Sequence, residues 1–322
     1  MTRICIFGAG AIGGYVGARL AMKGEAEVSL VARGPHLAAM QANGLTLKQA
    51  GETHVVRPYV TDDPARLGPQ DYIILTLKAH GLAGVIDALQ PLIGADTAIL
   101  FAQNGIPWWY FHGVGGRFEG TRLESVDPGG EIWQRLGPER ALGSVVWQAA
   151  EIEAPGVVAH HYGERMPIGE PTGEKTARAT RLSQLLTSAG IKSPVRPNLR
   201  NEIWLKLWGN LSFNPVSVLT RGTLEALATD PGTHRVIHAM MEEARAVAEA
   251  LGVEFPVSAD DRIGMAAQVG AHRTSMLQDV EAGRPTELEA LLGVVLELAR
   301  LVEIGTPSLQ LVYDLCKFRV GV

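Results

Sequence analysis

A cation and two amides recur at intervals of four residues within an otherwise apolar segment. Lys206, Asn210 and Asn214 belong to the stretch NEIWLKLWGNLSFNPVSVL, residues 201–219. Residues four apart in an α-helix lie one turn above each other, so these three side chains would form one stripe. A lysine shielded by Trp and Leu side chains can polarise a carbonyl and donate a proton to the alkoxide that forms. The alternative is a solvated polar stripe on a buried helix.

A proline follows the second of these amides. Pro215 lacks the N–H that would satisfy the Leu211 carbonyl, and it disfavours α geometry at Asn214. We therefore expect the helix to kink or end there and to turn Asn214 into a cavity. The amides beside Lys206 could then hold hydroxyl or carboxylate oxygens of a ligand a few carbons long.

A second polar segment, RTSMLQDVEAGRPTELEALLG, lies further along the chain. Thr286 and Glu289 have the spacing of a capping box, which predicts a helix whose first residue is Glu287. An acid at that position is ordinarily explained by the helix dipole. Ser275, at the start of the same segment, carries no signal by itself. His234 and His238 are four apart on a predicted helix, but no third ligand is evident, so no metal site is expected.

The N-terminus carries a glycine pattern typical of dinucleotide binding. Gly8, Gly10 and Gly13 form G-x-G-x-x-G directly after an apolar strand and at the start of a helix. The first glycine permits the tight turn, the second lets a pyrophosphate approach, and the third lets helix and strand pack closely. Amides at the helix N-terminus then hold the phosphate charge.

Three further residues follow the ends of predicted strands. The second strand ends in Arg33 without an acid, and a guanidinium matches a 2′-phosphate, so NADPH is favoured over NADH. The alternative is a solvated arginine. Lys78 and Asn104 follow two other strands, at the sheet edge where ligands bind in doubly wound folds.

The elements that must position these groups fall into two parts. With 322 residues, 46% of them hydrophobic, the chain suggests two domains. Strands alternate with helices in the first half, which predicts a parallel sheet covered on both faces. Residues 141–169 predict an antiparallel extension of that sheet, and residues 112–140 a Gly-rich excursion or flap. After a Pro-containing hinge at 192–200, helical periodicity predominates.

We thus predict an α/β protein, with a Rossmann-type doubly wound sheet (1–196) followed by an all-helical domain (197–322). The net charge of −5 and the absence of basic blocks argue against a nucleic-acid partner. No apolar run is long enough for a membrane span. Two distant cysteines, Cys5 and Cys316, are typical of a reducing cytoplasm rather than a disulfide framework. The sequence leaves the oligomeric state open, and a homodimer is compatible with it.

Taken in order, six motifs resemble the ketopantoate reductase (2-dehydropantoate 2-reductase) family over nearly the whole chain: GAGAIG, LVARG, TLKAH, QNG, IWLKLWGNLSFNP and SMLQD…RPTE. The resemblance implies a Rossmann domain plus a helical domain, with the active site in the cleft between them. It implies hydride transfer from NADPH to the C2 carbonyl of a branched 2-oxo acid for pantothenate synthesis. Lys206 would be the proton donor, and Glu287 would contact cofactor and substrate hydroxyl. Asn210, Asn214 and Ser275 would bind substrate, the serine near the carboxylate. The implied NADPH site comprises Gly8, Ala9, Gly10, Ala11, Ile12, Gly13, Arg33, Lys78, Asn104, Ala150 and Glu287.

Two departures from the family pattern affect the expected substrate. Leu292 stands where the family usually has an Asn, and the segment after Asn104 is longer and more aromatic. Residues 108–111 (Trp, Trp, Tyr, Phe) could widen or cover the substrate pocket. The substrate is then either ketopantoate or a bulkier or aromatic 2-oxo acid, as for D-mandelate-type dehydrogenases. A non-catalytic NADPH sensor is the alternative from another class, although it would have no reason to keep Lys206 with its asparagines.

Overall fold

The computed structural model describes residues 1–321, which divide into two compact units. The sheet unit comprises Met1–Gln103, Pro107–Arg122 and Gly130–Leu199, and the helical unit comprises Asn104–Ile106, Leu123–Gly129 and the chain from Arg200 onward. The boundary predicted from the sequence, between residues 196 and 197, places the two short segments 104–106 and 123–129 in the first domain. In the structure these segments belong to the helical unit, and the first of them contains Asn104.

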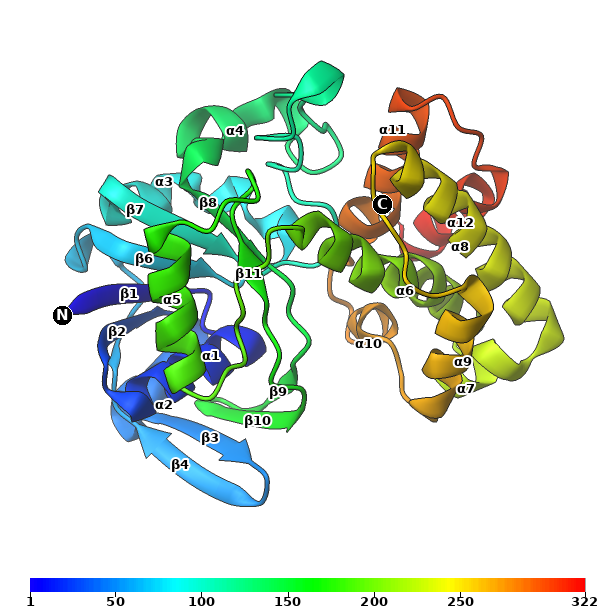
Figure 1. Cartoon of the computed structure of the whole chain (residues 1–322). Helices are drawn as coiled ribbons and strands as arrows, with labels where there is room; N and C mark the ends of the chain where they lie inside the picture. The colour runs from blue at the N-terminus through cyan, green and yellow to red at the C-terminus, as the bar shows by residue number, and fades with distance from the viewer. Residues whose placement is uncertain (322) are drawn as a thin grey trace. The chain divides into compact units, whose positions relative to one another are not determined.

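A seven-stranded sheet forms the centre of the sheet unit (Figure 1). Its strand order is β11-β8-β7-β6-β1-β2-β5, and neighbouring strands are parallel except for the antiparallel pair β8 and β11. The bounds are β1 (Thr2–Phe7), β2 (Ala26–Val31), β5 (Tyr59–Thr61), β6 (Gln70–Leu75), β7 (Ile93–Phe101), β8 (Ala141–Ser144) and β11 (Ile168–Gly169). The predicted doubly wound α/β fold is confirmed.

Helix α1 (Ala11–Lys23) packs between this sheet and a second one (Figure 1). The second sheet has the order β4-β3-β10-β9. A Cβ added at Gly17 would lie 3.2 Å from Leu30 of the large sheet, and one at Gly14 would lie 2.7 Å from Val158 of the small sheet. Glycines on both sides of α1 therefore allow close packing against two sheets. The small-sheet strands are β3 (Leu45–Gln49), β4 (Glu52–Val56), β9 (Ala149–Ala154) and β10 (Val157–Tyr162).

The predicted antiparallel extension of the large sheet is only partly right. Strands β8 and β11 do join that sheet, but β9 and β10 pair with each other and then, through β10, with β3. Val158 on β10 is fully buried against α1, whereas most of β9 is exposed. Burial of one face over α1 thus decides the pairing, and the local alternation of strands and turns does not contain that information.

The remaining helices of the sheet unit are α2 (Gly34–Asn43), α3 (Ile86–Leu89), α4 (Glu131–Leu136) and α5 (Ala177–Ser188). Residues 83–89 form a 3₁₀ turn followed by the single turn of α3. Helix α5 is joined to the sheet by the Tyr72 hydroxyl, which donates to the Arg178 carbonyl at 3.0 Å. The predicted 112–140 flap is not one open loop, because it contains α4 and three short 3₁₀ turns.

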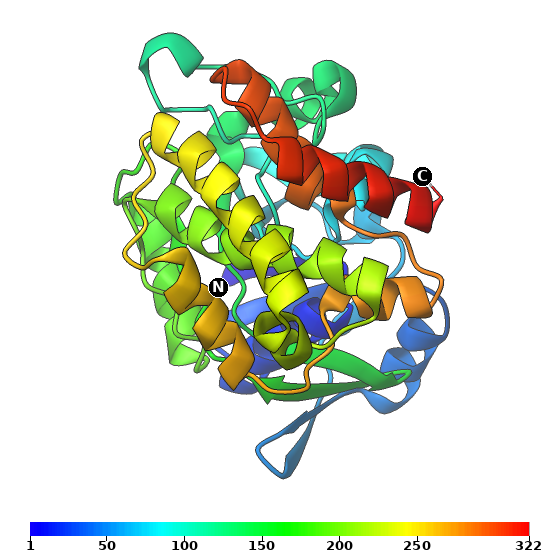
Figure 2. The ribbon, with the colours of Figure 1, turned by 90° about the vertical axis from the view of Figure 1, so that its right-hand side faces the viewer.

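The helical unit is built around α6 (Leu199–Thr220), and the prediction of an all-helical second part is confirmed. Four apolar side chains of α6 (Trp204, Leu207, Trp208 and Leu211) are at most 1% exposed. The Trp208 indole donates to the Met241 carbonyl of α8 at 2.7 Å. Figure 2 shows α8 and α12 facing the viewer within this unit. The other elements are α7 (Leu224–Thr229), α8 (Pro231–Ala250), α9 (Ala259–Gln268), α10 (Ser275–Glu281), a π-helical segment (Glu289–Gly293), α11 (Val294–Leu301) and α12 (Pro307–Val320).

Two local predictions for this unit need correction. Of the two outcomes expected at Pro215, a kink or an end of the helix, the end is wrong. Helix α6 continues to Thr220, because Val216, Ser217 and Val218 are buried and tertiary packing outweighs the missing hydrogen bond. The capping box at Thr286 does not form. Glu289 instead accepts a 2.6 Å hydrogen bond from the Tyr313 hydroxyl of α12, and helical structure begins after Glu287. Within residues 1–321, the helices are too short or too polar to cross a bilayer.

Candidate active site

The glycine loop between β1 and α1 has the geometry of a phosphate-binding turn. Gly8 adopts φ +96°, a conformation that favours glycine. The amides of Gly8 and Ala9 donate to the Val31 carbonyl at 3.2 and 2.9 Å, which ties the loop to the end of β2. A Cβ at Gly13 would lie 2.4 Å from the Gly8 carbonyl oxygen, so the third glycine permits the close packing of helix and loop.

The N-terminus of α1 is open to an anion. A Cβ at Gly10 would meet only one atom within 4 Å, the Gly8 carbonyl oxygen at 4.0 Å, so the space beside this residue is free. Helix α1 has no side-chain cap and no acid in its first turn, and its first amides, from Ala11 to Gly13, lack intrahelical acceptors. These residues fit the pyrophosphate of a dinucleotide.

The other predicted cofactor residues of the sheet unit lie where strands end. Arg33 follows β2, caps α2 with its backbone and is exposed. Lys78 follows β6 at the start of a 3₁₀ turn and is partly buried. Ala150 lies on β9 and is partly buried against the hydrophobic core of the unit, as is Ile12 of α1. Asn104 lies in the helical unit, together with the predicted catalytic residues.

A hydrogen-bonded chain joins Lys206, Asn104 and Glu287 inside the helical unit. The Lys206 ammonium donates to Asn104 Oδ1 at 2.8 Å, and Asn104 Nδ2 donates to Glu287 Oε2 at 3.1 Å. All three side chains are partly buried. Residues from three distant parts of the sequence thus meet, and the amide of Asn104 is oriented by a cation on one side and a carboxylate on the other.

Asn104 is held in place by the turn that follows it. Gly105 adopts φ +88°, and a Cβ there would lie 2.1 Å from the Ala290 carbonyl oxygen. That oxygen accepts a hydrogen bond from the Ile106 amide at 3.2 Å. Ala290 belongs to the π-helical segment that begins two residues after Glu287, and such segments frequently mark functional sites. Sequence reasoning missed the role of Gly105, although Asn-Gly is a turn signal.

The surroundings of Lys206 tune its proton affinity. Burial lowers the pKa of its ammonium from 10.5 to about 8, and the nearby Glu287 carboxylate opposes part of that decrease. A lysine whose pKa lies near neutrality can be a proton donor in reduction and an acceptor in the reverse reaction. The burial of this side chain explains the decrease, since the charged form is poorly solvated away from water.

The two other polar residues of the α6 stripe present amides without protein partners. Asn214 is buried and Asn210 is partly buried, yet across residues 1–321 neither side-chain amide makes a hydrogen bond to the protein. Among residues 1–321, the fully buried side-chain polar atoms that lack a partner include none from these two amides, so both amides reach space that a small molecule such as water can enter. These amides are therefore suited to hydrogen-bond a polar ligand beside Lys206.

Ser275 is placed near the Asn214 end of the stripe by a hydroxyl relay. The Ser217 hydroxyl donates to the Asn214 carbonyl at 2.7 Å and lies 2.5 Å from the hydroxyl of Thr274. Thr274 caps α10, whose first residue is the exposed Ser275. No local sequence pattern marks Ser217 and Thr274 as positioning residues, because the two residues lie 57 positions apart in the chain.

The aromatic segment after Asn104 does not provide a substrate surface. The side chains of Trp108, Trp109, Tyr110 and Phe111 are at most 2% exposed. Trp108 packs edge-on against Phe101 with ring centroids 5.4 Å apart, and Trp109 packs on Gly143. The expectation that these rings widen or cover the pocket is wrong, because their side chains are buried inside the protein.

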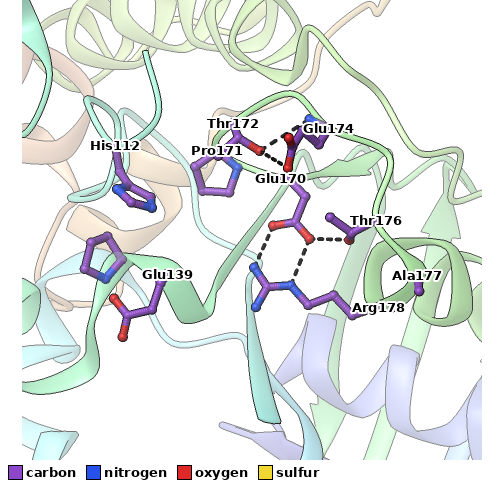
Figure 3. Close-up of a pocket in the computed structure, with 10 residues that line it drawn as sticks. His112, Glu139, Glu170, Pro171, Thr172, Glu174, Thr176, Ala177 and Arg178 are labelled. Carbon is purple, nitrogen blue, oxygen red and sulfur yellow. Dashed lines mark hydrogen bonds and ion pairs between the residues drawn. The ribbon is translucent and has the colours of Figure 1, made fainter. Parts of the chain in front are cut away.

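A hollow of about 460 Å³ in the sheet unit lies apart from the predicted site residues (Figure 3). Glu170 in its wall accepts hydrogen bonds from Arg178 Nε at 2.8 Å and Nη2 at 2.6 Å, so its charge is neutralised. His112, Glu139 and Thr172 also line it. In the described residues 1–321, no group of three or more His, Cys, Asp or Glu side chains is arranged to hold a metal ion.

Comparison with known proteins finds relatives that match nearly the whole chain. A family described as ketopantoate reductase PanE/ApbA matches residues 4–173, and its C-terminal domain family matches residues 198–320. A 2-dehydropantoate 2-reductase of Mesorhizobium japonicum is 53% identical over 315 residues, covering 98% of this chain and 97% of that protein. A 2-dehydropantoate 2-reductase of Halobacterium salinarum is 30% identical over 98% of both chains.

Solved structures show the same fold. A ketopantoate reductase structure from Ralstonia solanacearum has a TM-score of 0.94 at 39% identity and covers 100% of this chain and 98% of its own. D-mandelate dehydrogenase with NADH and anilino(oxo)acetate has a TM-score of 0.83 at 22% identity, over 99% and 98% of the chains, which shows likeness of fold alone. Two family matches that span most of the chain, together with a relative at 53% identity, identify this protein as a member of the ketopantoate reductase family.

Proposed function

We propose that this chain catalyses the NADPH-dependent reduction of 2-dehydropantoate (ketopantoate) to pantoate, a step of pantothenate biosynthesis. The observation that carries the proposal is the chain of hydrogen bonds from Lys206 through Asn104 to Glu287, beside two amides that have no protein partner. The 53% identical relative is itself named for this reaction. A non-catalytic NADPH sensor would have no use for a proton donor of tuned pKa beside unsatisfied amides.

In the proposed mechanism, each group of the helical unit has one task. NADPH, when bound, supplies the hydride that forms the new C–H bond at C2. Lys206 donates a hydrogen bond to the C2 carbonyl oxygen and then transfers its proton as that oxygen becomes an alkoxide, which leaves a neutral lysine and a 2-hydroxy acid. Asn210, Asn214 and Ser275 bind the polar oxygens of the substrate. Glu287 contacts the substrate hydroxyl and the cofactor.

The cofactor assignment rests on the sheet unit. The open space at Gly10 and the uncapped start of α1 fit a pyrophosphate, and residues 31–33, which end the second strand, offer Arg33 and no acid for the ribose. Lys78 and Ala150 are further proposed cofactor residues of this unit, and Asn104 and Glu287 are those of the helical unit. Cys5 and Cys316 are both buried and unpaired, in keeping with a cytoplasmic location.

The reduction of an aromatic 2-oxo acid is the alternative, but the burial of residues 108–111 removes the feature that favoured it. Initial rates with ketopantoate and with phenylglyoxylate, each with NADPH and with NADH, test the proposal. We expect ketopantoate with NADPH to give the highest kcat/KM. A preference for phenylglyoxylate would refute the substrate assignment, and a preference for NADH would refute the assignment of Arg33. Tight NADPH binding without reduction of either acid would indicate the sensor.

A further inference from the structure

A histidine that belongs to none of the motifs above lies at the start of α2 in the sheet unit. His36 is the third residue of this helix, and Arg33 is the residue that caps it, so both belong to its first turn. The two residues between them, Gly34 and Pro35, are exposed, whereas His36 is partly buried. Its side chain is therefore directed into the sheet unit rather than into solvent.

One ring nitrogen of His36 is bonded to the turn between β9 and β10. Nδ1 accepts a hydrogen bond from the Gly156 amide at 2.9 Å. Gly156 adopts φ +78°, and a Cβ there would lie 3.0 Å from the Cβ of Ala39 on α2. The Gly156 carbonyl in turn accepts a hydrogen bond from the Thr46 amide of β3 at 2.9 Å. The imidazole is thus fixed to a turn that the small sheet itself holds in place.

The same ring lies beside the glycine loop. The Ala9 backbone is close enough to raise the pKa of His36, as a carbonyl acceptor does, against the decrease caused by burial. Nε2 is fully enclosed and makes no hydrogen bond of normal length to residues 1–321. Ala9 itself is only 3% exposed. The imidazole therefore fills the space between the glycine loop and the turn at Gly156.

We propose that His36 is a positioning residue of the coenzyme site, which anchors the glycine loop and the Arg33 turn to the β9–β10 turn. The inference rests on the proposed function, since it takes the glycine loop and Arg33 as ligands of the pyrophosphate and the 2′-phosphate. Both phosphates belong to one molecule, so the affinity depends on how well the two protein segments are held in their binding geometry before the coenzyme arrives.

The anchor requires a neutral imidazole. Nδ1 can accept the Gly156 N–H only while it carries no proton, whereas a charged ring has donors at both nitrogens. Burial lowers the pKa of His36 below its ordinary value of 6.5, and no charged side chain within residues 1–321 contributes to the shift. The charged or titratable groups on the surrounding segments are Arg33 at the start of α2, Tyr59 on β5, and the ion pair of Lys48 on β3 with Glu153 on β9. Because protonation places two donors against each other, coenzyme affinity should fall as the pH decreases below this pKa.

Two substitutions separate the acceptor from the titration. His36→Asn places its Oδ1 at the position of Nδ1 and does not titrate, whereas His36→Leu leaves the Gly156 amide without its acceptor. Loss of a buried hydrogen bond corresponds to about tenfold in an equilibrium constant. At pH 8 we therefore expect the dissociation constant of NADP⁺ to rise about tenfold in His36→Leu and by less than about threefold in His36→Asn.

The experiment measures NADP⁺ binding by calorimetry from pH 8 to pH 5 for wild type, both variants and the matched control His161→Asn. NADP⁺ is used because, unlike NADPH, it is stable in acid. His161 is exposed on β10 of the same unit and lies 3.2 Å from Glu151. Protonation of the 2′-phosphate is common to all four proteins. Between pH 8 and pH 5, wild type and the control should lose about tenfold more affinity than His36→Asn.

Three results would overturn the proposal. Wild type and His36→Asn could lose affinity in parallel in acid, a folded His36→Leu could bind NADP⁺ as tightly as wild type at pH 8, or the control could lose its acid sensitivity as well. If His36→Leu does not fold, the comparison of wild type with His36→Asn decides alone. In each case, reduction of ketopantoate by wild type leaves the proposed function intact. If wild type binds NADP⁺ at no pH, the coenzyme assignment fails first, and the role of His36 fails with it.

Discussion

Replacement of Glu287 by Gln tests how the site sets the proton affinity of Lys206. If Lys206 donates the proton, kcat/KM for reduction should be constant at low pH and fall about tenfold per unit above its pKa of about 8. The Glu287 carboxylate raises that pKa because it favours the charged ammonium. Glu287→Gln removes this contribution and keeps a similar shape, so we expect the decline to begin at lower pH.

The size of the shift follows from the geometry. One amide separates the two charges, through hydrogen bonds of 2.8 and 3.1 Å. At an effective dielectric constant of ~20, unit charges a few ångströms apart interact by about 2–4 kcal/mol. Both groups are partly exposed, so we discount this to about 1–3 kcal/mol, which corresponds to about 1–2 pH units.

The assay is the pH profile of kcat/KM for ketopantoate reduction at saturating NADPH. Glu289→Gln is the matched control, because Glu289 lies two residues away and pairs with Tyr313. Its profile should decline at the wild-type pH. A Glu287→Gln profile that coincides with wild type, or that moves to higher pH, would refute the assignment of the titrating group. A uniform loss of rate alone would not affect this test, since only the position of the decline is compared.

Three other variants test the cofactor site and the core. Arg33→Gln should reduce the preference for NADPH over NADH by about 10- to 100-fold in kcat/KM, while Arg66→Gln, an exposed control, leaves it unchanged. Gly13→Ala places a Cβ against the Gly8 carbonyl and should weaken NADPH binding at least ~10-fold in titrations, unlike Gly84→Ala, which meets open space. Trp109→Ala should lower the free energy of unfolding by about 3–5 kcal/mol in denaturant titrations without altering the ratio of ketopantoate to phenylglyoxylate rates.

The parts of the fold that the sequence predicted are those specified locally. The buried strands β1, β2, β6 and β7 each contain a short, largely apolar run, and the glycines after β1 fix the turn into α1 by sterics alone. Helical periodicity likewise identified the second half of the chain. Each of these signals is contained within about twenty residues, so no knowledge of the tertiary structure is needed.

The parts that the sequence did not predict depend on distant contacts. Strands β9 and β10 leave the large sheet because β10 pairs with β3, more than 100 residues earlier in the chain. Helix α6 passes through Pro215 because its last turns are buried. The sequence suggested that the aromatic residues 108–111 could line the substrate pocket. Composition alone does not reveal that their side chains are buried.

The candidate site shows the same division. Regular spacing on α6 was enough to single out Lys206, Asn210 and Asn214. Asn104 was recognised only as a strand-end residue, whereas in the structure it bridges Lys206 and Glu287. That bridging role joins residues more than 100 positions apart in the chain, so it leaves no local pattern.

Single-turnover reduction of ketopantoate by Lys206→Met, with NADPH already bound, tests the central claim most directly. Removal of the proton donor should slow the reaction by about 100- to 10,000-fold, while the NADPH dissociation constant stays within about twofold of wild type. Oxidation of bound NADPH at the wild-type rate by this variant would contradict the account, because the proton would then have to come from another group.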